Sequence, residues 1–151
     1  MEIYRKNIGE YASIMTTPLV FFIAVGIVQF VVRIIGYFLQ NNLVRILGWV
    51  LLAFMEAVWV IMLVYISWVA VSRKRWSAIN TLIAGIIFGF LAGFVAAVAL
   101  SFGNVVAMIV AGTWTVFKVA AWSGVSVVFL PIIKGVLGGF VAGIIGLILE
   151  K

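Results

Sequence analysis

Four side chains that can carry a charge or make strong hydrogen bonds stand inside long apolar stretches of the chain. They are Gln29, Arg33, Glu56 and Lys134. A charged group at the middle of a bilayer costs at least about 2.5 kcal/mol on insertion scales, so such residues pair with each other or serve a function. Gln29 and Arg33 are four residues apart and share one face of a helix. These four residues form the candidate intramembrane site.

An ion pair between Glu56 and Arg33 is the arrangement that we predict for this site. The other glutamates lie near the ends of the chain: Glu2, Glu10 and Glu150. A turn at 41–42 would fold the second apolar stretch against the first, which leaves Arg33 and Glu56 about one to two helical turns apart in depth. Lys134 is expected to extend its side chain towards the membrane surface.

Two interpretations of the Glu56–Arg33 pair remain open. In the one that we favour, the role is structural: a permanent pair that fixes the register of two helices, or a contact with a polar group on a neighbouring subunit. In the other, Glu56 loads and releases a proton or a cation. The first is favoured because proton relays usually contain several ionisable groups, and because Arg33 would hold Glu56 in its charged form.

The composition removes most enzymatic chemistry. The chain has no cysteine, histidine or aspartate, so thiolate metal sites, disulfides and imidazole acid–base catalysis are excluded. We expect no enzyme activity, no metal and no cofactor. The net charge is +6, but most basic residues lie at the ends of apolar segments. There they set membrane orientation, so we expect no nucleic-acid binding.

The apolar segments themselves predict an all-α integral membrane helical bundle. Of the 151 residues, 67% are hydrophobic and 9% are charged, whereas soluble domains carry roughly 25% charged residues. Residues 1–15 predict a short amphipathic helix at the membrane surface, because apolar residues recur there at helical spacing. Four transmembrane helices of a single domain, 1–151, are expected to follow, over 18–40, 43–71, 79–100 and 131–149.

The segment 105–122 decides the number of spans. It is apolar but contains Lys118, threonines and tryptophans, so it is interfacial, re-entrant or a fifth span; we expect four spans. The run Arg73-Lys74-Arg75 is predicted to be cytoplasmic by the positive-inside rule. Two spans precede it, which places the N-terminus in the cytoplasm as well. Four spans place the C-terminus there too, and five would place it outside.

Small residues recur at every fourth position in the last two predicted spans. They are Gly85, Gly89, Gly93 and Ala97 in one span, and Gly135, Gly139 and Gly143 in the other. Such a pattern, a glycine zipper, lets a second helix approach closely. We expect the two spans to pack on each other within the chain, and a contact face for another subunit is the alternative.

These features lead to two functional hypotheses. The first is a non-catalytic accessory or structural subunit of a larger membrane protein complex, held by small-residue helix faces. Its partners would be the lipid bilayer and other membrane subunits or a second copy of the chain. The alternative is a small oligomeric transporter or channel that uses Glu56 and Arg33 within the membrane.

Overall fold

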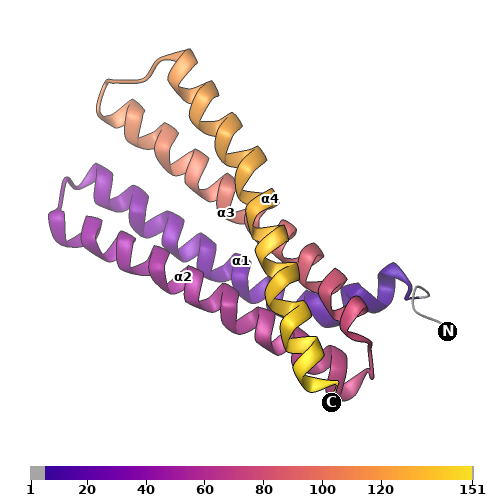
Figure 1. Ribbon diagram of the computed structural model, residues 1–151. Coiled ribbons are helices and arrows are strands. Elements are labelled where there is room, and N and C mark those ends of the chain that lie inside the picture. The colour runs from indigo at the N-terminus through magenta and orange to yellow at the C-terminus, as the bar shows by residue number, and fades with distance from the viewer. Residues whose placement is uncertain (1–5, 151) are drawn as a thin grey trace.

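The computed structural model describes residues 6–150, which form a bundle of four long helices (Figure 1). Their bounds are Ile8–Phe38 for α1, Asn42–Trp68 for α2, Ala78–Val110 for α3 and Val116–Leu149 for α4. A short π-helix, η1 (Val69–Arg73), continues α2. All four are long and apolar enough to cross a membrane. The predicted fold class, an all-α bundle with four candidate spans, is therefore confirmed.

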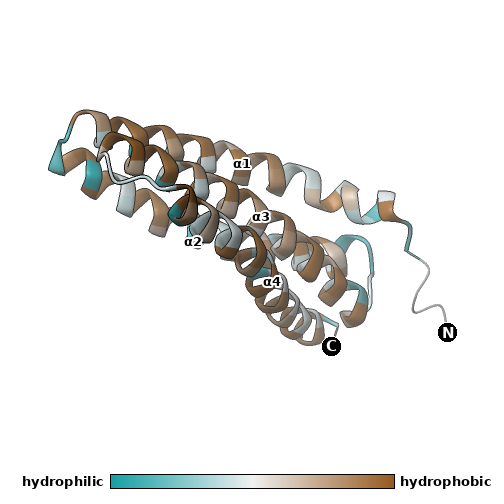
Figure 2. Cartoon of the chain, turned by 90° about the horizontal axis from the view of Figure 1, so that it is seen from above, coloured by the Kyte–Doolittle hydropathy of each residue, from teal (hydrophilic) through white to brown (hydrophobic). Residues whose placement is uncertain are grey.

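The helices are longer than a bilayer requires. The four candidate spans contain 31 to 34 residues, which corresponds to about 46 to 51 Å of helix. The hydrocarbon layer of a bilayer is about 30 Å thick. Hydrophilic residues gather mainly at the two ends of the bundle, where the turns lie (Figure 2). Several ångströms at each helix end therefore extend into the headgroup layer.

The bundle consists of two helical hairpins, α1–α2 and α3–α4. The turns within the hairpins lie at one end, which we call the open end because the hairpins separate there (Figure 1). The start of α1, the α2–α3 connection and the end of α4 lie at the opposite, closed end. Between residues 116 and 130 of α4 no residue is buried, whereas the second half of this helix contains all eight of its buried residues.

Polar contacts join the elements at the closed end. The Tyr11 hydroxyl donates a hydrogen bond to Asn80 Oδ1 at 3.1 Å, and its ring packs edge-on against Trp76 with centroids 4.8 Å apart. The first backbone N–H of α3, at Ala78, donates to a carboxylate oxygen of Glu150 at 3.1 Å. These bonds connect α1, α3 and α4, and the second one satisfies an N–H group that the start of a helix leaves unpaired.

Helices α3 and α4 approach each other through their small residues. A Cβ atom added at Gly93 would lie 2.6 Å from Pro131 Cα and 2.7 Å from the Leu130 carbonyl oxygen. Cβ atoms at Gly85 and Gly89 would likewise overlap the backbone of α4, at Gly138 and Lys134. The small-residue face of α3 is thus occupied by α4 of the same chain.

Helix α1 begins at Ile8 and continues without a break through Pro18. Residues 8–15 therefore do not form a helix separate from the first span, and residues 1–5 lie outside the described residues. Asn7 caps the helix by accepting from the Gly9 N–H at 3.2 Å. The Thr16 hydroxyl donates to the Ala12 carbonyl at 2.7 Å within the helix. Pro18 lies inside the helix and is buried in the bundle, a position that membrane helices tolerate.

The bounds of the last two spans also differ from the prediction. The expected turn at 101–104 is helical, and the chain turns at 111–115, where Gly112 has a φ of +66°. Residues 105–122 therefore divide between the end of α3, this turn and the start of α4. Thr115 caps α4 by accepting from the Lys118 N–H at 3.2 Å, and the helix continues through Pro131.

Candidate intramembrane sites

Glu56 forms its ion pair with Lys134 and not with Arg33, so the predicted partner was wrong. The Lys134 Nζ donates to Glu56 Oε2 at 2.5 Å, which joins the middle of α2 to the middle of α4. The turn at 41–42 relates the depths of Arg33 and Glu56 only along the α1–α2 hairpin. It carries no information on the position of α4, which was expected to begin only at Pro131.

Lys134 is held in the interior of the bundle and does not extend to the membrane surface. Its side chain is 6% exposed, and its Nζ lies 4.5 Å from the centroid of the Trp59 ring and 6.0 Å from that of Phe22. Aromatic faces stabilise an ammonium group most when it is removed from water. The absence of a side chain at Gly89 lets the backbone of Lys134 lie against α3, so the lysine side chain can cross the bundle to α2.

Glu56 is far more accessible than its partner. Its side chain is 49% exposed although it lies near the middle of α2. Trp59, one turn further along, is 7% exposed, and its indole Nε1 is buried without a hydrogen-bond partner. In a membrane, the carboxylate is therefore only partly neutralised by the chain itself.

Arg33 is instead held by α3. Its Nη2 donates to Asn104 Oδ1 at 2.8 Å. Two glycines lie directly beside it: a Cβ at Gly48 would lie 3.7 Å from Arg33 Cα, and one at Gly103 would lie 3.4 Å from Arg33 Cδ, both at ordinary contact distance. The guanidinium carbon is also 5.9 Å from the centroid of the Trp49 ring. Asn104 was expected in a turn, and the bond to Arg33 shows its structural role in α3.

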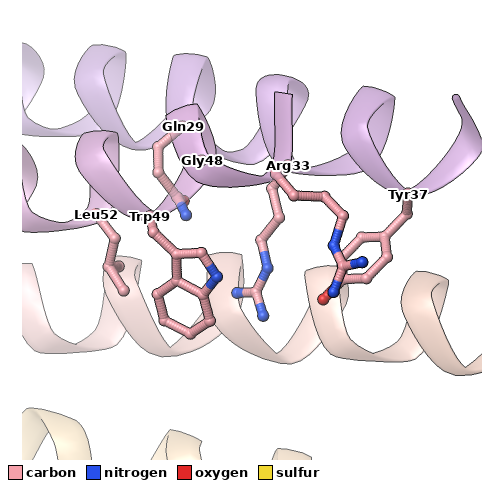
Figure 3. A pocket seen from close by; sticks show the side chains of 7 residues that line it. Gln29, Arg33, Tyr37, Gly48, Trp49 and Leu52 are labelled. Atoms are coloured by element: carbon pink, nitrogen blue, oxygen red, sulfur yellow. The ribbon is translucent and has the colours of Figure 1, made fainter. Parts of the chain in front are cut away.

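A small pocket lies beside Arg33 in the α1–α2 hairpin, near the open end. Its volume is about 70 Å³. The labelled side chains project from the hairpin to the same side (Figure 3). The lining residues are Gln29, Arg33, Tyr37, Arg45, Gly48, Trp49 and Leu52. We call this cavity the arginine pocket.

Two guanidinium groups line the arginine pocket without a carboxylate to balance them. Neither Arg33 nor Arg45 forms an ion pair with any acid among residues 6–150. The acids in this range are used elsewhere: Glu10 pairs with Lys6, Glu56 with Lys134, and Glu150 accepts from a backbone N–H. The pocket is therefore electropositive.

The comparisons with known proteins give no family. No protein family, curated protein or solved structure matches this chain. Interpretation therefore depends on the geometry alone. Among residues 6–150, no cluster of acidic residues could hold a metal ion.

The four predicted site residues thus fall into two separate places. Gln29 and Arg33 line the arginine pocket, and Glu56 and Lys134 form the mid-bundle ion pair. Sequence reasoning missed Arg45 and Asn104 as members of a site. A signal was present for the pocket, because Tyr37 continues the spacing of four residues that joins Gln29 to Arg33. No comparable signal pointed to Asn104.

Proposed function

We propose that this protein is a non-catalytic subunit of a membrane protein assembly, in which another chain covers the Glu56 face of α2. The observation that carries the proposal is the half-exposed carboxylate of Glu56 near the middle of a candidate span. Lys134 contacts only one of its oxygens, Oε2. A carboxylate oxygen in hydrocarbon without a donor is costly, and a donor from a neighbouring chain would remove that cost.

Two further features support an assembly. The turns within the hairpins are short, at residues 39–41 and 111–115, so contacts with other proteins would be made mainly within the membrane. The first half of α4 has no buried residue and is free to contact a neighbour. The small-residue face of α3 does not support the proposal, because α4 already occupies it.

Native mass measurement after mild detergent extraction tests the proposal. We expect a mass above that of one chain, and we expect Glu56→Gln to shift the population towards the monomer. Glu10→Gln is the matched control, since Glu10 lies in the first turn of α1 and pairs with Lys6. A monodisperse monomer of the unaltered protein, with no co-purifying partner, would contradict the proposal.

Cysteine cross-linking locates the contact if the neighbour is a second copy. The chain has no cysteine, so each introduced thiol reports one position. Ala53 is exposed on α2 one turn before Glu56, whereas Ala24 is exposed on α1. Oxidation should give dimers with Ala53→Cys and few with Ala24→Cys.

A second candidate function is a small oligomeric transporter or channel. It is favoured by the polar row of Tyr37, Arg33 and Gln29 along one face of α1, which lines the arginine pocket near the open end. The Glu56–Lys134 pair lies deeper in the bundle. Purified protein in liposomes should then conduct ions, and Glu56→Gln should abolish the flux. Flux that persists unchanged in this variant would remove the proposed role of Glu56.

A further inference from the structure

We propose that the arginine pocket binds a phosphate group, supplied by a lipid headgroup. Phosphate is an oxyanion that guanidinium groups recognise through paired N–H donors. The pocket contains two such groups and no carboxylate. The chain's own charges therefore leave an anion-binding position in this pocket.

The structure leaves donors available for this ligand. A guanidinium group has five N–H donors, and only one hydrogen bond from Arg33 is made within the described residues, to Asn104. This bond, together with the packing of Gly48 and Gly103, fixes Arg33 in place before a ligand arrives. Arg45 is exposed and makes no side-chain hydrogen bond within residues 6–150, so it can close on the bound group.

The depth of the pocket favours a lipid as the source of the phosphate. Arg33 lies five residues before Phe38, the last residue of α1, which is about 8 Å along the axis. Arg45 lies three residues after the start of α2, or about 5 Å. Because the helices exceed the hydrocarbon layer by several ångströms at each end, both residues lie near the boundary of that layer, from which their long side chains can reach headgroup phosphates.

The buried amide of Gln29 gives the pocket a polar floor. Gln29 is only 2% exposed and faces the pocket from α1 (Figure 3). Its side-chain N–H₂ group is a donor that suits a phosphate oxygen at the deep side. A phosphate would thus meet donors from both helices of the hairpin, a more specific arrangement than scattered surface charges.

Thermal unfolding of the purified protein in an uncharged detergent tests this proposal. The probes are dioctanoyl phosphatidylglycerol and inorganic phosphate, each titrated at constant ionic strength, with dioctanoylglycerol as the control that has the chains but no phosphate. We expect phosphatidylglycerol to raise the unfolding temperature and dioctanoylglycerol to leave it unchanged.

Three variants distinguish binding in the arginine pocket from nonspecific attraction of an anionic lipid by the positive charge of the protein. Arg45→Gln should weaken the apparent affinity for phosphatidylglycerol about tenfold, the loss expected for one charge-assisted hydrogen bond. Arg45→Lys, which keeps the charge, should lie between this variant and the unaltered protein. Lys118→Gln is the matched control, because Lys118 is exposed near the start of α4 at the same end and does not line the pocket.

Three outcomes of these titrations would change or overturn the proposal of a lipid-phosphate site. A shift with inorganic phosphate alone, lost in Arg45→Gln, would keep the phosphate site and assign it to a free anion. An equal loss in Arg45→Gln and Lys118→Gln would overturn the proposal, since binding would then follow overall charge. So would the absence of any shift with either phosphate probe.

Discussion

Residues that look alike in the sequence have different roles in the bundle. Arg33 and Lys134 are both basic and both stand in apolar stretches, yet one is bound to a neutral amide and the other to a carboxylate. The two residues differ in which helices pack beside them in the folded chain. Lys134 reaches Glu56 because the backbone of α4 lies against α3 at Gly89. The spacing of the small residues predicts that contact, but it does not indicate which side chain of α4 then faces α2.

The Glu56–Lys134 pair gives a prediction at the residue scale. Glu56→Gln should lower the free energy of unfolding by about 3 kcal/mol, because it leaves a buried ammonium group without its counter-charge. Lys134→Met should also be destabilising, because it leaves the Glu56 carboxylate, which is half-exposed near the middle of a candidate span, without its counter-charge. Reversible unfolding in bicelles measures both values.

The double variant provides the control for that prediction. Glu56→Gln combined with Lys134→Met removes the buried charge together with its partner. Its cost should therefore be smaller than the sum of the two single costs. Strict additivity would show that the two residues are not coupled in the folded protein.

At the scale of elements, the sequence predicted the number and type of the helices more reliably than their ends. The apolar segments gave four spans because long apolar runs have few alternatives in a membrane. Pro18 and Pro131 were expected at helix starts, but both are buried inside longer helices. A proline is compatible with either position, and local sequence could not decide between them.

The packing of α3 on α4 gives a prediction at the same scale. Gly93→Ala should destabilise the protein by about 2 kcal/mol, because the new methyl group would overlap the backbone at Pro131 and neither helix can yield without separating. Gly124→Ala is the matched control, as nothing lies within 4 Å of the added carbon. That change should be neutral or slightly stabilising, since alanine is the better helix former. Unfolding temperatures of the two variants give the comparison, and equal values would contradict the packing.

The whole molecule is connected more extensively at one end than at the other. Side-chain hydrogen bonds connect α1, α3 and α4 at the closed end. Towards the open end the Arg33–Asn104 bond still joins α1 to α3, but residues 116–130 of α4 contain no buried position. Sequence analysis did not predict this asymmetry. It arises from contacts between residues about 70 positions apart, such as Tyr11 with Asn80, which only the folded chain brings together.

This asymmetry predicts unequal motion of the two ends. Spin labels attached at Asn42→Cys and Thr113→Cys, in or beside the two turns of the open end, should give a broad distance distribution. Labels at Ser13→Cys and Lys74→Cys, near the closed end, should give a narrow one, because the elements there are joined by buried contacts. Double electron–electron resonance in nanodiscs measures both distributions. Equally narrow distributions would show that the open end is rigid.

The excess length of the helices has a consequence for how the bundle meets the lipid around it. Helices of 31 to 34 residues are longer than the hydrocarbon layer is thick, so they tilt, extend into the headgroups or thicken the adjacent bilayer, and each ångström of mismatch costs a fraction of a kcal/mol. Because four helices share this excess, thinning of the surrounding bilayer would be opposed by all of them at once.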